Sequence, residues 1–395
     1  MKEKWVVSAK KADFQAIGQH FGIDPVLARI MRNRGLTDLQ EMNLYLHGTR
    51  ADLNDPHLLK DADLAAEILR EKIKEKKRIR IIGDYDIDGI QSTYILYCAL
   101  RRLGADADFV IPDRILDGYG LNEHLVTRAS QDGIDTILTC DNGISAIDQI
   151  HLAKSLGMTV VVTDHHEVPF TEVDGVRREK VCEADAVVNP KQQACHYPFK
   201  KLCGAAVAFK LVQVLYEVFG LEVSEADCFI ENAGFATVGD VMDLQGENRI
   251  LVKLGLEMLN RTTNIGMKAL ILQNKLTMGA IKSHDIGFRI GPCLNASGRL
   301  DTARLSLKLL LCESETEAAV LAEEIVELNE SRKLLTMHAV EQAKEIAQQE
   351  EYVNDRVLVI FLPDCHESLA GIVAGRIREA YYRPTLVVTR SEHCA

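Results

Sequence analysis

The chain has 395 residues, of which 47% are hydrophobic, and its formal net charge is −12. This length suits roughly two or three domains, and the apolar content is ample for packed cores. No apolar run approaches the ~18 residues of a membrane span, and Met1–Trp5 lacks the apolar centre of a secretory signal, so we expect a globular, cytoplasmic protein without membrane contact. The negative balance argues against bulk electrostatic attraction to nucleic acid but leaves room for a local basic groove.

The ten cysteines show no CxxC spacing, and several lie within apolar runs, where we interpret them as small buried hydrophobes. Cys195, His196 and Cys203 form the one candidate group for a metal, but their neighbours are typical of an ordinary loop. We therefore expect neither a disulfide framework nor a structural zinc site.

The first 50 residues carry a helical pattern of apolar residues with Gly35 as a stop signal, which predicts a small helical lead-in. An amphipathic helix rich in Lys and Glu is expected over 64–77, and a strand follows it over 78–83. The Lys/Arg run at 72–80 favours a solvated helix face over a contact with nucleic acid.

Downstream of this strand, strand-like and helix-like runs alternate. The strands are expected at 109–112, 136–140, 159–163 and 186–189, with helices such as 92–103 and 145–156 between them. This alternation predicts βαβ units, a parallel sheet and therefore the α/β class. A well-buried helix is expected over 203–219, and a further segment over 229–238 leads into the acidic stretch 239–243.

Residues 315–351 are different, because their apolar side chains recur at spacings of three, four or seven with charges between them. This pattern predicts a long amphipathic helix that connects two lobes. Beyond it, the sequence indicates the start of a second α/β unit, with a strand at 357–361, a helix at 370–381 and a strand at 385–389. We therefore divide the chain into a lead-in, a first α/β domain, a connecting helix and a partial second domain, at 1–50, 51–314, 315–351 and 352–395.

Three of the predicted strands end in acids or in an acid followed by histidines. These residues are Asp84, Asp86 and Asp88 after the first strand, Asp141 after 136–140, and Asp164, His165 and His166 after 159–163. The ends of parallel strands converge on one edge of a sheet, and clustered carboxylates repel one another unless cations neutralise them. A metal site is the economical explanation.

The ligand types also indicate which ions would bind. Carboxylates alone suit Mg²⁺, whereas the added imidazole of His165 favours an ion such as Mn²⁺. Five or more ligands exceed what one ion normally takes from a protein while leaving positions for a substrate, so we infer two divalent ions. Two metals about 3.5–4 Å apart suit in-line displacement at phosphorus, because they stabilise both the attacking and the leaving oxygen.

Two other interpretations explain the acids less well. The spacing of Asp84, Asp86 and Asp88 before Gly89 matches the first half of a calcium EF-hand loop, but the twelfth position is Ile95 where a bidentate Glu is needed. A role in capping a helix that begins near Gln91 would explain one aspartate but not three. Asp164-His165-His166 taken by itself would suit an ordinary loop with satisfied polar groups equally well.

The motifs together resemble the DHH phosphoesterase superfamily, and within it the single-stranded-DNA-specific 5′→3′ exonucleases. The resemblance rests on Gly83–Gly89, Asp141–Ser145 and Thr163–Glu167, with support from Gly118–Asn122, Tyr197–Lys200, Gly246–Arg249 and Ile290–Leu300. The later part resembles the beginning of the superfamily's DHHA1 domain at Ser368–Arg376 and Tyr382–Pro384. A later glycine-rich nucleic-acid-binding motif and an oligonucleotide-binding fold are missing, which indicates a C-terminally truncated member.

The resemblance implies roles for individual residues. The implied metal ligands are Asp86, Asp88, Asp141, His165 and Asp240, with Asp141 bridging the two ions, Asp84 as a further ligand or supporting acid, and Asp243 as a less favoured substitute for Asp240. Asp164 would orient His165, and His166 would lie near the scissile phosphate.

The same resemblance implies a substrate contact outside the acidic motifs. Arg299 would contact a substrate phosphate from a turn at 295–300, in which Asn295 and Ser297 would also bind substrate; a surface salt bridge is the simpler alternative for Arg299.

The activity implied is two-metal hydrolysis of single-stranded DNA from its 5′ end, in DNA repair and recombination. The expected partners are single-stranded DNA, a single-strand-binding protein and a helicase, and we expect a monomer. One alternative is a phosphodiesterase for short oligonucleotides or cyclic dinucleotides. Another is a non-catalytic replication scaffold, but such members tend to lose the metal-binding residues that are present in this chain.

Overall fold

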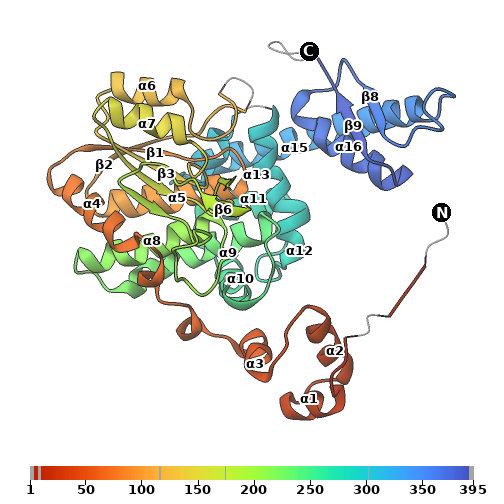
Figure 1. The fold of residues 1–395 in the computed structure, drawn as a ribbon, viewed down its shortest axis with the longest axis horizontal. Coiled ribbons are helices and arrows are strands. Elements are labelled where there is room, and N and C mark those ends of the chain that lie inside the picture. Colours follow the sequence, from red (N-terminus) through yellow and green to blue (C-terminus); the bar gives the residue numbers. More distant parts are fainter. Residues whose placement is uncertain (1–3, 8–9, 115–116, 174, 301, 391–395) are drawn as a thin grey trace.

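The computed structural model describes the chain apart from residues 1–3, 8–9, 115–116, 174, 301 and 391–395, so Cys394 lies outside the described residues. Near the N-terminus, three short helices form a separate small unit (Figure 1): α1 (Phe14–Phe21), α2 (Pro25–Asn33) and α3 (Leu39–His47). Helix α2 ends two residues before Gly35, where the sequence predicts a stop. The core of this N-terminal unit is small, with Met31, Leu36 and Met42 at its centre.

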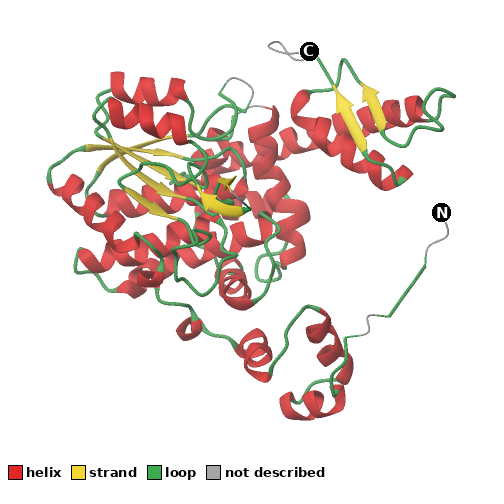
Figure 2. Ribbon diagram, viewed as in Figure 1, coloured by secondary structure: helices red, strands yellow, loops and turns green. Residues whose placement is uncertain are grey.

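The main body is built on a five-stranded sheet with the order β2-β1-β3-β4-β7, and every neighbouring pair of its strands is parallel (Figure 2). Its strands are β1 (Arg78–Ile82), β2 (Asp106–Val110), β3 (Thr136–Cys140), β4 (Thr159–Thr163) and β7 (Ala186–Val188). The predicted α/β class with a parallel sheet is confirmed. The strands read as continuous apolar runs because helices cover both faces of the sheet.

Side chains alternate between these two faces along each strand. Ile81 and Leu138 point to the face covered by α4 (Ala62–Lys74), α5 (Ile87–Arg102) and α8 (Gly204–Val218). Ile82 and Ile137 point to the opposite face, which is covered by α6 (Glu123–Gln131) and α7 (Ile147–Ser155). Figure 1 shows the two layers on either side of the sheet.

A group of helices extends the main body beyond the sheet and buries a second apolar core. They are α9 (Ile230–Gly239), α10 (Gly246–Leu259), α11 (Ile265–Gln273), α12 (Ser283–Asp285), a π-helical turn (Ile286–Ile290), α13 (Gly291–Leu300) and α14 (Arg304–Leu310). Short 3-10 turns lie at Arg50–Asp52, Pro56–Leu58 and Val223–Phe229. A hairpin of β5 (Phe170–Val173) and β6 (Val176–Glu179) was not predicted.

The long helix α15 (Glu315–Ala347) joins this body to a second lobe made of β8 (Leu358–Phe361), α16 (Glu367–Tyr381) and β9 (Thr385–Val388) (Figure 1). The first half of α15 contributes Leu321 and Ile325 to the core of the main body. The second half contributes Ala339 and Ala343 to the core of the second lobe. None of the described helices is both long enough and apolar enough to span a membrane.

Because the halves of α15 belong to different cores, we predict that damage to one half stays in one lobe. Ala343→Asp places an unpaired carboxylate in a fully buried position and should cost roughly 3–5 kcal/mol of the second lobe's stability. Hydrogen exchange should speed up in β8, α16 and β9 while α11 and α13 keep their protection. Gln342→Asp adds the same charge at an exposed neighbour and serves as the control; faster exchange throughout both lobes would contradict the prediction.

Candidate metal centre

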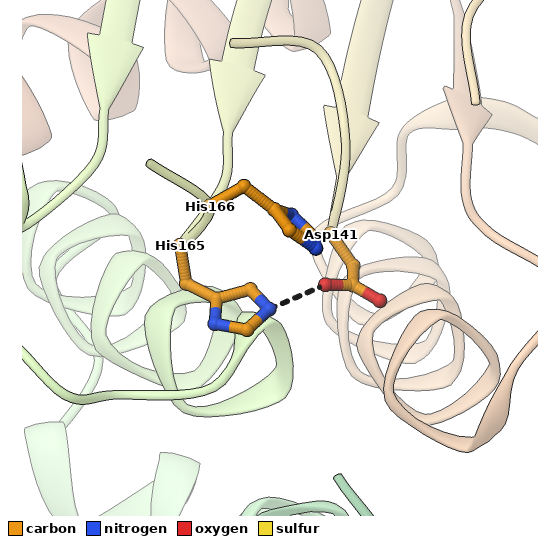
Figure 3. A group of neighbouring side chains, drawn as sticks. All are labelled: Asp141, His165 and His166. Atoms are coloured by element: carbon orange, nitrogen blue, oxygen red, sulfur yellow. Dashed lines mark ion pairs between the residues drawn. The ribbon is translucent and has the colours of Figure 1, made fainter. Parts of the chain in front are cut away.

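The carboxyl ends of β1, β3 and β4 lie side by side, and the residues that follow them meet at one edge of the sheet. Figure 3 shows Asp141, His165 and His166 converging there. The Nε2 atom of His165 lies 3.0 Å from Asp141 Oδ1, 3.5 Å from Asp88 Oδ2 and 3.9 Å from Asp240 Oδ2. One imidazole nitrogen therefore faces carboxylates from three different segments.

Three overlapping groups of side chains have ligand atoms within 4.8 Å of one another: Asp84, Asp86 and Asp141; Asp88, His165 and Asp240; and Asp141, His165 and His166. All six metal ligands expected from the sequence are among them, and His166 is the one addition. Asp141 and His165 each occur in two groups, so neighbouring cations would share these ligands.

Helix starts hold two of these acids by their backbone N–H groups. Asp86 is the N-cap of α5, and its Oδ1 accepts hydrogen bonds from the N–H groups of Asp88 (2.9 Å) and Gly89 (3.0 Å). The helix thus begins at Ile87, four residues earlier than Gln91, where the capping alternative put its start. Capping occupies one oxygen of Asp86 and leaves its other oxygen for an ion.

The N-terminus of α8 holds Asp88, whose two oxygens accept from the N–H groups of Gly204 (2.6 Å) and Ala205 (2.8 Å). This end of α8 carries a partial positive charge, which stabilises the carboxylate. A Cβ atom at Gly204 would lie 2.7 Å from the Cβ of Asp141, so only glycine allows the helix to approach this closely.

Asp141 occupies a strained backbone position, with φ at 62°. Its N–H group donates to Thr163 O of the neighbouring strand at 3.1 Å. The side chain of Asn142 donates to the carbonyl oxygens of Ile82 (3.1 Å) and Cys140 (2.9 Å), which fixes the turn after β3. The turn presents the Asp141 carboxylate between the other acids.

Asp164 orients His166, and not the side chain of His165 as the resemblance implied. Its Oδ1 lies 2.7 Å from His166 Nδ1 and also accepts from the backbone N–H groups of both histidines. Burial would raise the pKa of Asp164, but its partners, led by His166, hold it below the usual range. Burial would lower the pKa of His166, and the bond to Asp164 raises it instead. His165 is free of this pairing because its ring points toward the other acids.

The carboxylates would repel one another strongly without cations. Burial, followed by the charge of Asp86, raises the pKa of Asp84 to about 7. Burial, followed by the charge of Asp88, raises the pKa of Asp240 to about 7. Burial and the surrounding acids also raise the pKa of Asp141 well above its usual value. These are the shifts expected of a group of acids that divalent cations would neutralise.

The donor set fits divalent ions. Asp84 Oδ1 and Asp141 Oδ1 are buried and receive no hydrogen bond from the described residues, so each has an electron pair available to a cation. Burial lowers the pKa of His165, which favours the neutral imidazole that metals bind. Carboxylate oxygens combined with one imidazole suit Mn²⁺, and Mg²⁺ accepts the oxygens.

The two acids of the segment after α9 lie in different places. Asp240 caps the end of α9 and faces His165, whereas Asp243 forms an ion pair with Lys201 at the surface, 2.5 Å apart. The structure therefore favours Asp240 over Asp243 as the ligand from this segment.

The predicted turn at 295–300 is wrong, because these residues lie in α13. Gly298 allows close packing of this helix: a Cβ atom there would lie 2.4 Å from Tyr85 O. Asn295 Oδ1 accepts from the N–H of Ile87 at 2.8 Å and supports the start of α5. Ser297 is fully buried and lies 2.8 Å from Ser306 Oγ, so its hydroxyl has a packing role and is not placed to bind a substrate.

Arg299 lies at the contact between the two lobes. Its Nη1 donates to Ser368 O at 2.7 Å, and Ser368 Oγ donates to Arg299 O at 3.0 Å. Burial, followed by the charges of Arg114 and Arg332, lowers the pKa of Arg299. Among the described residues no carboxylate forms an ion pair with Arg299, and its Nη1 donates to a carbonyl oxygen instead.

Three side chains near the acids were missed by the sequence analysis. The Tyr119 hydroxyl lies 3.2 Å from His166 Nε2 and 3.2 Å from Asp141 O, while 53% of the residue is exposed. The guanidinium of Arg114 lies 3.9 Å from the ring centre of Tyr85. Tyr85 stands within the acidic motif and Tyr119 between two glycines, so the aromatic residues beside these motifs were the available signal.

This site can be compared with known proteins. The DHH family, N-terminal domain, matches residues 78–232, which include β1 to β4 and α8 with most of the acids. The RecJ single-stranded-DNA-specific exonuclease of Bacillus subtilis is 35% identical over 388 residues, covering 98% of this chain and 47% of that protein. The chain thus spans about half the length of this relative.

Two solved structures have the same fold. A crystal structure of exonuclease RecJ bound to manganese matches with a TM-score of 0.74 and 34% identity, covering 84% of this chain and 80% of that one. RecJ of Thermus thermophilus in complex with Mn²⁺ matches with a TM-score of 0.78 and 30% identity, covering 95% of this chain and 52% of that one.

The sheet and its acidic edge define a DHH domain. Within that class, the chain belongs to the RecJ family.

The raised pKa values predict how pH affects stability. In the folded, metal-free chain Asp84 and Asp240 keep their protons up to about pH 7, whereas their ordinary pKa is 3.8. The folded state therefore binds more protons than the unfolded state between these values, and its stability falls as pH rises through them. We expect Mn²⁺, which binds deprotonated carboxylates, to raise the Tm more at pH 8 than at pH 6.

Thermal unfolding with and without Mn²⁺ at both pH values measures this effect. Asp141→Asn removes a carboxylate from two of the three groups and should reduce the Mn²⁺-dependent rise in Tm. An equal rise at both pH values that survives in Asp141→Asn would contradict the prediction.

Proposed function

We propose that this chain is a metal-dependent exonuclease that hydrolyses single-stranded DNA from its 5′ end with two divalent ions, Mn²⁺ or Mg²⁺. The observation that carries the proposal is the meeting of Asp84, Asp88, Asp141, His165 and Asp240 in overlapping groups at one edge of the sheet. Family membership adds support, because the relatives are named single-stranded-DNA-specific exonucleases and solved RecJ structures are described with Mn²⁺ and with Mg²⁺.

The residues of the chain would divide the work of hydrolysis. When bound, the two ions would activate the attacking water and stabilise the charge that develops on the phosphate. The carboxylates and His165 would hold the ions. His166 keeps its Nδ1 proton on Asp164, which directs Nε2 toward the space beside Tyr119 where a phosphate would lie. This orientation lets His166 exchange a proton at Nε2 with the reacting phosphate.

Several features beside the acids suit an extended single strand. The half-exposed ring of Tyr119 is available to stack against a base, which is a common way to bind single strands without sequence preference. Arginines gather here from the loop after β2 and from α13, α15 and α16. Burial, followed by the charges of Arg114 and Arg332, lowers the pKa of Arg299, and burial with the charge of Arg376 lowers that of Arg332. Arg299 and Arg332 donate to uncharged acceptors, Ser368 O and Asn329 Oδ1, so a nucleic-acid backbone would supply a counter-charge.

The alternatives from the sequence analysis differ in what they predict. A phosphodiesterase for short oligonucleotides or cyclic dinucleotides would use the same acids without needing the arginines on α15 and α16. A non-catalytic scaffold would not need intact groups of ligands. A monomeric state, cytoplasmic location and partnership with a single-strand-binding protein or helicase stay predictions.

Digestion of end-labelled single-stranded DNA with Mn²⁺ tests the proposal. We expect release of mononucleotides from the 5′ end, with little cleavage of duplex or dinucleotide. Asp141→Asn should reduce the rate roughly 10²–10³-fold, the scale seen when a group that stabilises transition-state charge is lost. Asp243→Asn, a surface change of the same kind, should leave the rate unchanged. Cleavage confined to dinucleotides would favour the first alternative, and metal binding without cleavage of either would favour the second.

The position of Arg299 predicts a separate effect on substrate binding. Arg299→Ala should raise KM for single-stranded DNA about tenfold with a smaller change in kcat, because a charged contact to phosphate is lost. Arg299→Lys should recover only part of the affinity, since lysine lacks the planar fork. Arg289→Ala removes an exposed arginine that pairs with Asp285 and serves as the control. A KM that is the same in all three variants would contradict this role.

A further inference from the structure

Asp240 is the more exposed of the two carboxylates in the group that it forms with Asp88 and His165, with 27% of its side chain accessible against 1% for Asp88. It lies at the end of α9 and starts a short loop to α10, and its neighbour Val241 is 88% exposed with φ at 57°. Strands and helix starts hold the other acids.

We propose that a buried network around Glu247 positions Asp240, so that Tyr197, Lys210 and Glu247 are positioning residues for the metal centre. This inference rests on the metal-dependent function proposed above. It also gives a role to two segments that support the family resemblance, 197–200 and 246–249, and that the hydrolytic mechanism does not use. We call the side chains of Asn54, Tyr197, Lys210 and Glu247 the Glu247 anchor.

Every acceptor position of the Glu247 carboxylate in the anchor is occupied. Its Oε1 lies 2.6 Å from Lys210 Nζ and 3.0 Å from the N–H of Asn54. Its Oε2 accepts from the Tyr197 hydroxyl at 2.6 Å and from Asn54 Nδ2 at 3.0 Å. Lys210 Nζ donates in addition to Asn54 O at 2.6 Å. Four donors from three other segments therefore fix the first turn of α10.

The charges of the anchor are fully removed from water, since the side chains of Lys210 and Glu247 are 0% and 1% exposed. A buried ion pair often contributes little net stability, because desolvation offsets the attraction between the charges. Apolar side chains would fill the same space at lower cost. What the ion pair adds is geometry: it allows one position of α10 relative to α8, the helix whose N-terminus holds Asp88.

The residues next to Glu247 carry this geometry to the Asp240 loop. Asn248 Nδ2 donates to Lys201 O at 2.7 Å and to Asp243 O at 3.2 Å. The N–H of Gln245 donates to Asp243 O at 2.9 Å. Asp243 O, three residues after Asp240 in this loop, thus accepts hydrogen bonds from two donors at the start of α10.

On its other side Asp240 is held by α9, where its N–H donates to Ala236 O at 2.8 Å. If α9 alone fixed Asp240, loosening the anchor would change stability without changing metal affinity. If the anchor fixes Asp240, loosening the anchor would lower the affinity for an ion held by Asp88, His165 and Asp240. The two cases differ in metal affinity measured at a temperature where every variant is folded.

A double-mutant cycle with Mn²⁺ as the probe tests the inference. Tyr197→Phe removes one hydroxyl from Glu247 with almost no change in shape, and calorimetry should show Mn²⁺ binding to the group of Asp88, His165 and Asp240 weakened about tenfold, as is typical when support of a ligand is lost. In the Asp240→Asn background the same change should have no further effect, because the ligand it positions is gone. Tyr94→Phe, which removes a half-buried hydroxyl bonded to Asn264, is the matched control and should bind Mn²⁺ as the wild type does.

Glu247→Gln extends the test with a stronger change, and circular dichroism checks that it folds. A loss of Mn²⁺ affinity in Tyr197→Phe that is equal in both backgrounds, or no loss in a folded Glu247→Gln variant, would overturn the inference while the proposed function stands. Wild-type protein that binds no Mn²⁺ would overturn the proposed function and the inference with it.

Discussion

The mutual repulsion of buried carboxylates is the constraint on which this structure is organised. Asp84, Asp86, Asp88 and Asp141 lie within one small region because parallel strands deliver their ends to one edge. The fold offsets part of the cost with the N–H groups that begin α5 and α8. Burial, together with the remaining repulsion, raises the pKa of Asp84 and of Asp240 to about 7 in the metal-free chain. Divalent cations bound at this edge would offset the repulsion that remains.

Sequence reasoning found the sheet and most of the acidic edge for a physical reason. Strands covered on both faces must be apolar throughout, so runs such as 136–140 and 159–163 stand out and their ends are easily located. An acid directly after such a run therefore lies at the carboxyl edge of the sheet. The strand β2 was placed three residues late, because Asp106 and Asp108 interrupt its apolar pattern while pairing with arginines of β1.

The features that sequence reasoning missed depend on contacts between distant segments. Residues 295–300 contain Asn, Ser and Gly, which favour turns, yet packing against the acidic motif makes them helical. The partner of Asp164 could not be chosen between two adjacent histidines without the direction of each ring. The β5–β6 hairpin carried a local signal, the Asp-Gly pair at 174–175, which was overlooked. Nothing local in Tyr197 or Lys210 indicated that both meet Glu247.

Because the two halves of α15 pack into different cores, the length of this helix sets the orientation of one lobe relative to the other. A helix of 33 residues is about 50 Å long, and each added residue turns everything beyond it by about 100°. An insertion in the exposed middle of α15 would leave both cores intact and still rotate the second lobe away from Ser368's contact with Arg299. An insertion into α15 would therefore keep the contact between Arg299 and Ser368 only if its length restores the orientation of the second lobe.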